Sequence, residues 1–201
     1  MDDDDRVLQA IQPIYTDPTT RQLANGLPPR LLLGWVFAES SGVYNHVERT
    51  GEAGYFQIDP DGQRLLHATV DQVIRSKQNS LQYGLRHVQA CKAWLQGELE
   101  RTHVALDPRD DGLSERLTKL VHTVGAPSVG MLLRSVARAT QEPLTWDTLT
   151  AHWRKNASRL NSGTLRNPER MIANVDRVMV NGARLAPRSM PPSSTQTTPA
   201  P

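Results

Sequence analysis

The sequence predicts a mainly α-helical fold with one small β-hairpin and a C-terminal tail. Apolar residues recur at three- and four-residue steps through most of the chain, which is the spacing of one helix face. Only residues 43–60 break this spacing, because they are rich in turn formers. The chain has 201 residues, of which 38% are hydrophobic, enough to build the core of one domain of about 150 residues with appendages.

Apolar stripes predict five helices, over residues 28–42, 81–99, 113–124, 129–136 and 167–182. Pro28 and Pro29 suit the first turn of a helix, and Gly42 suits its end. Asn167 caps the last helix, which we expect to end at Gly182. Cys91 lies on the apolar stripe of the second helix, so we expect it in the core.

The run from Tyr55 to Ile58 predicts one strand of the hairpin, directly after the first of these helices. Three regions follow along the chain. Residues 1–27 form an acidic N-terminal segment with a short helix, residues 28–185 form the helical domain, and residues 186–201 form the tail. The tail is rich in Pro, Ser and Thr and holds five of the fourteen prolines, so we expect it to be disordered or draped over a partner.

The net charge of +2 is unevenly distributed. Residues 151–190 contain eight basic and two acidic side chains, while the first five residues carry a charge of −4. A basic end suits an anionic partner such as a cell-wall polymer or nucleic acid, and a solvated helix face is the alternative. No recognition motif for nucleic acid accompanies these charges, which argues against nucleic acid as the partner.

Several functional classes are excluded by composition. The longest uncharged apolar stretch, residues 31–38, is far below the ~18 residues of a membrane span. The acidic start is the reverse of a signal peptide, so we expect none. The single cysteine excludes an internal disulfide and a multi-cysteine zinc site, and the six histidines lack metal-ligand spacing. We therefore expect no metal and no cofactor.

Glu39 is the first candidate for a catalytic residue. Leu32, Trp35, Val36 and Glu39 are spaced i, i+3, i+4 and i+7, which places the carboxylate on the apolar stripe of its helix. A carboxylate there is either paired or partly desolvated, and desolvation raises the pKa of a carboxyl toward the range that a general acid needs. The alternative is a buried glutamate that an arginine holds for structural reasons.

The sequence around Glu39 resembles the soluble lytic transglycosylase and goose-type lysozyme family. That family has a Glu-Ser pair at a helix end and, some fifteen residues later, a Gly-aliphatic-Met-Gln-aliphatic strand. Residues 39–40 and 54–58 match these two segments, and residues 80–84 and 122–125 are similar to two further ones. The resemblance covers roughly residues 28–180 and implies a lysozyme-like helical domain.

The resemblance implies cleavage of the β-1,4 bond between N-acetylmuramic acid and N-acetylglucosamine in peptidoglycan. In the transglycosylase branch one glutamate, here Glu39, protonates the glycosidic oxygen. It then acts as a base on the muramic 6-hydroxyl, which closes a 1,6-anhydro ring. A hydrolytic lysozyme needs a second acid. Glu48 and Glu52 are the first candidates and Asp59 and Asp61 the next, although each also reads as a solvent-facing loop charge.

Supporting roles are implied for five other residues. Ser40 would bond the carboxylate or the N-acetyl group of the substrate, and Gln57 would contact sugar. Tyr55 and Phe56 would offer ring faces to sugars, although alternation along a strand would put one of them in the core. His122 stands where the family has a tyrosine and is a candidate support for the acid.

Departures from the family pattern keep a second hypothesis open. Ser80 replaces an asparagine, unless Asn79 serves with a one-residue shift. Thr123 replaces another asparagine, and Met171 replaces a tyrosine that faces the glutamate. These changes favour a weakly active or inactive module of a phage particle or secretion machine, which docks partners through its tail and its acidic N-terminus. The active alternative would work in the periplasm or cell wall, delivered as a component of a phage virion.

Overall fold

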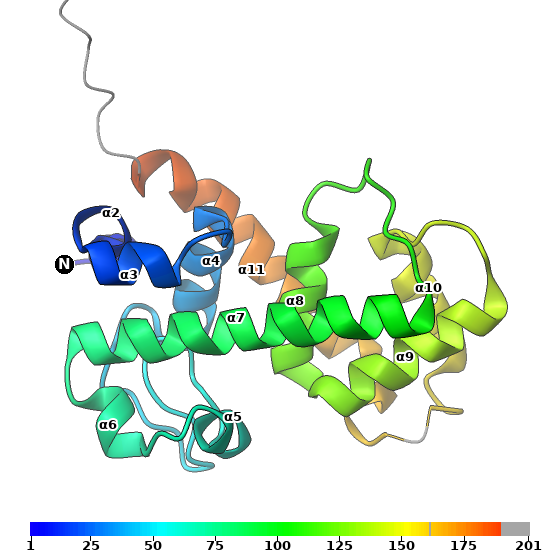
Figure 1. Ribbon diagram of the computed structural model, residues 1–201, viewed down its shortest axis with the longest axis horizontal. Helices are drawn as coiled ribbons and strands as arrows, with labels where there is room; N and C mark the ends of the chain where they lie inside the picture. Colours follow the sequence, from blue (N-terminus) through cyan, green and yellow to red (C-terminus); the bar gives the residue numbers. More distant parts are fainter. Residues whose placement is uncertain (161, 190–201) are drawn as a thin grey trace, which may run out of the picture.

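The computed structural model describes residues 1–160 and 162–189, and this part of the chain is built from eleven α-helices and one short 3₁₀ helix (Figure 1). It contains no β-sheet within these residues. The predicted mainly α-helical fold is therefore confirmed. Within the same residues, no helix is long and apolar enough to cross a membrane.

The helices that apolar spacing predicts are α4 (Pro29–Ser40), α7 (Lys77–Thr102), α8 (Leu113–Val124), α9 (Ala126–Ala139) and α11 (Pro168–Ser189). The N-terminal segment forms α1 (Asp3–Ile11), α2 (Pro13–Thr16) and α3 (Pro18–Leu23). Spacing gave no sign of α5 (Pro60–Leu65), α6 (Val70–Ile74), α10 (Trp146–Asn156) and the 3₁₀ helix η1 (Thr164–Arg166). Most of these are too short to show a full apolar stripe.

The predicted hairpin strand from Tyr55 to Ile58 is wrong. Residues 43–59 form a loop, in which isolated bridges pair Val47 with Ala53 and Ala53 with Ile58. The backbone N–H groups of Ala53 and Ile58 each donate to the other's carbonyl, at 3.1 and 3.0 Å. Between them Gln57 has a left-handed φ of 47°. The aromatic residues therefore lie in the tight turn itself, and a turn of this kind leaves no room for a strand.

The last helix continues seven residues beyond the expected end at Gly182. Residues 186–189, which we expected in the tail, form its final turn. Ser189 is buried there, with its hydroxyl 3.2 Å from the Tyr15 hydroxyl. The rest of the expected tail, residues 190–201, lies outside the described residues. Gly182 does not end the helix because it serves as a contact point for α4, described below.

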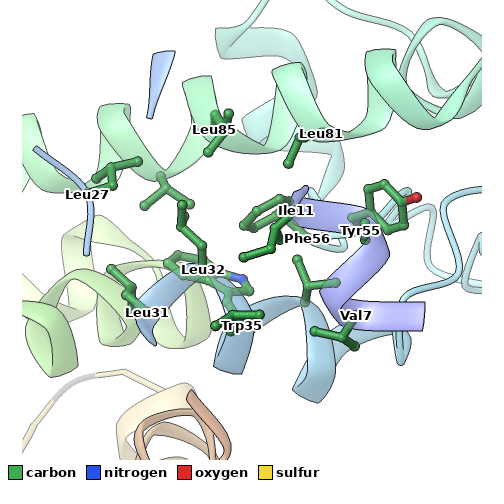
Figure 2. Close-up of a cluster of buried hydrophobic side chains, with 14 of the residues drawn as sticks. Val7, Ile11, Leu27, Leu31, Leu32, Trp35, Tyr55, Phe56, Leu81 and Leu85 are labelled. Carbon is green, nitrogen blue, oxygen red and sulfur yellow. The ribbon is translucent and has the colours of Figure 1, made fainter. Parts of the chain in front are cut away.

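Two hydrophobic clusters fill the interior, and the long helix α7 runs through both (Figure 1). Figure 2 shows the first cluster, in which Trp35 of α4 packs against Phe56 of the loop with ring centroids 6.0 Å apart. Leu81 and Leu85 of α7 close it from the side. Cys91, farther along α7, belongs to the second cluster and is buried, as its position on the stripe predicted.

Helices α4 and α11 touch through their backbones at two glycines. A Cβ added to Gly34 would lie 1.9 Å from the carbonyl oxygen of Val178, and one added to Gly182 would lie 1.9 Å from that of Arg30. No side chain fits at either point. The pair of glycines therefore sets the distance between the two helices.

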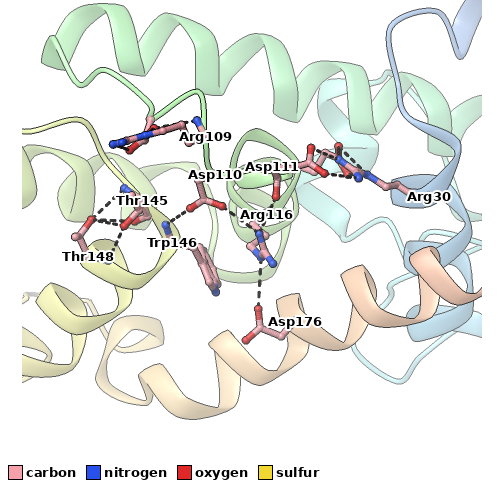
Figure 3. A network of polar contacts seen from close by, with 11 residues as sticks. Arg30, Arg109, Asp110, Asp111, Arg116, Thr145, Trp146, Thr148 and Asp176 are labelled. Carbon is pink, nitrogen blue, oxygen red and sulfur yellow. Dashed lines mark hydrogen bonds and ion pairs between the residues drawn. The ribbon is translucent and has the colours of Figure 1, made fainter.

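A network of charges fixes the start of α8 against its neighbours (Figure 3). Arg30 of α4 pairs with Asp111 at 2.8 Å and with Glu115 at 2.7 Å. Arg116 lies between Asp110 at 3.6 Å and Asp176 of α11 at 3.7 Å. The network joins α4, α8 and α11, so it orients the face of α8 that points toward α4.

The acidic N-terminus pairs with the basic end of the same chain. Asp4 of α1 accepts hydrogen bonds from Arg184 at 2.8 Å and from Arg188 at 2.7 Å. The hydrogen bond from Arg184 lowers the pKa of the Asp4 carboxyl below its usual range. The expected anionic partner of these two arginines is therefore supplied, at least in part, by α1.

We expect the substitution Gly34→Ala to destabilise the fold by about 1–3 kcal/mol, because the new methyl group must displace a backbone carbonyl. Gly97→Ala in α7 is the matched control. Its added Cβ meets nothing within 4 Å, so replacing a mid-helix glycine there should stabilise by about 0.5–1 kcal/mol. Urea unfolding measures both changes, and a Gly34→Ala protein as stable as the parent would contradict the close contact.

Candidate active site

A cleft of about 770 Å³ opens where α4, the loop 43–59, α8 and α11 meet. Five of the predicted site residues line it: Glu39, Glu48, Glu52, Gln57 and His122. Its lining also includes two of the three departures from the family pattern, Thr123 and Met171. The volume falls in the range of about 300–1,000 Å³ that is typical of ligand sites.

Glu39 lies in the last turn of α4, with 19% of its side chain exposed, toward the cleft. The helix ends directly after it, because Ser41 adopts a left-handed φ of 48°. The carboxylate accepts a hydrogen bond from the ammonium group of Lys119 on α8. His122 Nε2 lies 3.8 Å from the same oxygen. Glu39 is therefore paired, which was one of the two alternatives expected for it. Its partner is a lysine and not an arginine.

Lys119 is the residue that sequence reasoning missed. It is fully buried, and its Nζ lies 4.7 Å above the centre of the Trp35 ring. Burial lowers the pKa of Lys119, and the neighbouring Glu39 opposes this shift. A signal was present in the sequence. Glu115, Lys119 and His122 are spaced i, i+4 and i+7, which defines a second, polar face of α8 that turns toward α4.

A pair of histidines leads from the cleft, which His122 lines, to the buried His87 in the interior. His122 Nδ1 lies 3.0 Å from Nε2 of His87 on α7, and one of these two nitrogens donates to the other. Burial lowers the pKa of His87 to about 4 and that of His122 well below its usual range, so both are neutral at pH 7. Burial raises the pKa of Cys91, 3.7 Å from His87, to about 12, which makes its thiol unreactive.

Three predicted substrate contacts do not reach the cleft. Tyr55 and Phe56 are 1% and 0% exposed, because both rings of the turn pack into the first cluster, and neither face is open to a sugar. The Ser40 hydroxyl lies 2.9 Å from the Tyr55 carbonyl and 3.1 Å from that of Val36, so it ties α4 to the loop instead of bonding Glu39. The Ser80 hydroxyl in turn accepts the Tyr55 backbone N–H at 2.7 Å.

Gln57 combines three features of a ligand-binding residue. It lines the cleft, it has a left-handed backbone, and its Oε1 is buried without a hydrogen-bond partner among the described residues. Its Nε2 donates to the Gly54 carbonyl at 2.7 Å, which orients the amide. An unpaired buried acceptor is costly, and a strained non-glycine backbone is typical of functional sites.

The candidate second acids have partners in the loop. Glu48 lies 2.8 Å from His46 Nε2, and Glu52 accepts from the Thr50 hydroxyl. Asp59 caps α5 by accepting the Gly62 N–H at 2.7 Å. Glu48, Glu52 and Asp59 line the cleft, whereas Asp61 pairs with Arg64 outside it.

Helix α11 forms the opposite, basic wall of the cleft. Its lining residues are Arg170, Met171, Ala173, Asn174 and Arg177. The Thr123 hydroxyl donates to the Lys119 carbonyl at 3.0 Å and lies 3.4 Å from Asn174 Oδ1. In the described part of the chain, no group of three or more His, Cys, Asp or Glu side chains could hold a metal ion. The arrangement is suited to acid-base chemistry on a polar ligand.

No protein-family model matches the chain, and no curated protein matches it.

We expect the protein to lose stability between about pH 6.5 and pH 4. His87 stays neutral in the folded state down to about pH 4, while unfolded chains bind the proton from about pH 6.5, so acid favours unfolding. The loss from this residue is about 3 kcal/mol, and His122 acts in the same direction. Chemical denaturation at pH 7 and pH 4.5 measures the loss.

His87→Gln should flatten this pH dependence, because glutamine does not titrate. His103→Asn is the control, since His103 is exposed and asparagine accepts its left-handed φ of 54°. An unchanged pH dependence in the His87→Gln protein would refute the assignment.

Proposed function

We propose that the protein cleaves peptidoglycan at the β-1,4 bond between N-acetylmuramic acid and N-acetylglucosamine, with Glu39 as the acid and base. The observation that carries the proposal is that Glu39 and Gln57 line one cleft. Glu39 and Gln57 lie in the two segments that match the family best, and 18 positions separate them in the sequence. The cleft brings the proposed acid and the proposed sugar-contacting residue together.

The chemistry would proceed as in lytic transglycosylases, with a single carboxyl. Glu39 in its acid form gives a proton to the glycosidic oxygen as the bond to C1 breaks and its electron pair moves to that oxygen. The carboxylate then takes the proton of the muramic 6-hydroxyl, whose oxygen bonds to C1. Glu39 regains the proton it gave, so the site is restored without another reactant. Gln57 would contact the sugar at the wall of the cleft.

Hydrolysis is the second chemical outcome to test. Glu48 and Glu52 line the same cleft as Glu39, and either could activate water. The side chains of Glu48 and of its partner His46 are 54% and 43% exposed, so this carboxylate is open to solvent.

A second function is a weakly active or inactive binding module of a phage particle or secretion machine. The ion pair between Lys119 and Glu39 favours it, since a neighbouring cation stabilises the carboxylate form of an acid. Met171 also favours it, because a thioether at the cleft wall does not bond a carboxylate as a tyrosine hydroxyl would. In this case the basic wall with Arg170 and Arg177 would hold the glycan without cleaving it.

The proposed setting is the periplasm or cell wall, reached as a component of a phage virion or tail. The proposed partners are peptidoglycan glycan strands and other proteins of the particle, bound through residues 190–201. Of the basic residues near the end, Arg170 and Arg177 line the cleft, while Arg184 and Arg188 pair with α1.

Glu39→Gln should lower muralytic activity by about 10²-fold or more, because the amide keeps the shape but carries no transferable proton. The amide oxygen can still accept from Lys119, yet a buried cation loses its counter-charge, so we expect a lower melting temperature. A zymogram and a turbidity assay on peptidoglycan measure activity. Glu100→Gln, on the exposed side of α7 and away from the cleft, is the matched control, and equal activity of Glu39→Gln and the parent would refute the site.

The products should end in 1,6-anhydro-muramic acid, detected by mass spectrometry as species that lack one water. This follows from the single carboxyl of the proposed mechanism. Reducing-end muramic acid as the main product would instead indicate hydrolysis, and the Glu48→Gln and Glu52→Gln proteins would then identify the second acid.

A further inference from the structure

We propose that Lys119 is a positioning residue that exchanges one proton with Glu39, so that the acid form of Glu39 is accessible at neutral pH. This inference rests on the proposed function, because it concerns the same carboxyl. It goes beyond that function in assigning the source of the catalytic proton to a second, buried residue.

The geometry separates the two partners by their access to the cleft. The Glu39 side chain is 19% exposed, whereas that of Lys119 is 1% exposed. Glu39 Oε1 is the only hydrogen-bond acceptor of Lys119 Nζ among the described residues, and the Trp35 ring covers the cation from one side. An ammonium group has three donors. Lys119 therefore has fewer acceptors than its charged form requires, and the carboxylate is the group to which its proton can pass.

The surroundings of the pair disfavour a charged lysine. The titratable and charged groups that face it are Glu39, His87, Cys91, His122 and Arg177, with Glu48, Glu52, Asp59 and Arg170 farther around the cleft. The two histidines are neutral, and Arg177 adds a positive charge. Burial is the main cause that lowers the pKa of Lys119. The positive charge of Arg177 lowers it further, whereas Glu39 raises it.

The proton balance is simple. A carboxylate with an ammonium and a carboxylic acid with an amine hold the same number of protons, and they differ only in the position of one proton along the hydrogen bond. In water the charged pair is strongly favoured. A desolvated site reduces the free-energy difference between the charged pair and the neutral pair. In the proposed cycle the proton moves from Lys119 to Glu39, then to the glycosidic oxygen. The 6-hydroxyl proton returns to Glu39 and then to Lys119, so nothing is consumed.

A lysine that supplied only charge would behave differently. It would hold Glu39 as a carboxylate, and an arginine would serve equally well. An arginine, however, does not release its proton in a protein, because the guanidinium pKa is above about 12. The comparison of arginine with methionine at position 119 therefore separates a proton-exchanging lysine from a structural charge.

The test is the pH dependence of kcat/KM on purified peptidoglycan, from pH 4 to pH 9, for the parent, Lys119→Arg and Lys119→Met proteins. The parent should be active across the neutral range. Lys119→Arg should lose at least about 10-fold at every pH above 5. Lys119→Met should lose activity progressively as the pH rises, because Glu39 then takes its proton only from solvent.

Controls separate folding from proton exchange. Lys155→Met, on the exposed face of α10 and away from the cleft, should leave the profile unchanged. Circular dichroism and melting temperature report folding, and Lys119→Arg carries the test alone if Lys119→Met does not fold.

A parent-like profile in Lys119→Arg overturns the inference and makes Lys119 a structural charge, while an inactive Glu39→Gln protein would still support the proposed function. Full activity in Glu39→Gln overturns the proposed function itself. A parent protein without muralytic activity overturns both.

Discussion

The backbone contact between α4 and α11 is the constraint on which the rest of the site depends. Gly34 and Gly182 let each helix touch a carbonyl of the other, so the distance between the helices is fixed by atoms that cannot change rotamer. Glu39 follows five residues after Gly34, and Arg177 precedes Gly182 by five. The opening of the cleft between these two side chains is therefore set by the helix crossing and not by the loop 43–59 opposite.

Two ion pairs fix the position of α8 against α4, and α4 supplies the cation in one of them and the anion in the other. Near the start of α4 a cation, Arg30, meets Glu115, and near its end an anion, Glu39, meets Lys119. A slide of α8 by one turn would place Lys119 toward Arg30, with like charges facing in a poorly solvated space. Pairs of this kind add little net stability, but they reject the wrong register. The same charge that aligns the helix also adjoins the proposed catalytic carboxyl.

Helical spacing predicted α4, α7, α8 and α11 because each buries one stripe over several turns. Prediction from the sequence pattern failed where the tertiary contacts of a residue, and not its local pattern, decide its conformation. Tyr55 and Phe56 suggest a strand, yet the glycine before them and the left-handed Gln57 after them make a turn. Gly182 suggests a helix end, yet it serves helix contact. For the site, Glu39, Gln57 and His122 could be selected from sequence. Lys119 was missed, since a lysine is taken as exposed unless its neighbours at i−4 and i+3, Glu115 and His122, are considered with it.

The ion pairs of Asp4 with Arg184 and Arg188, and the contact of Tyr15 with Ser189, bring the first and last described helices together. A domain whose chain enters and leaves at one point can be carried as an insert in a loop of a larger protein without stretching that loop. It can also be circularly permuted, with the old ends joined by a short linker and new ones opened in an exposed connection such as that between α9 and α10. The ion pairs that hold the first and last described helices together thus allow the domain to be inserted or permuted as one unit.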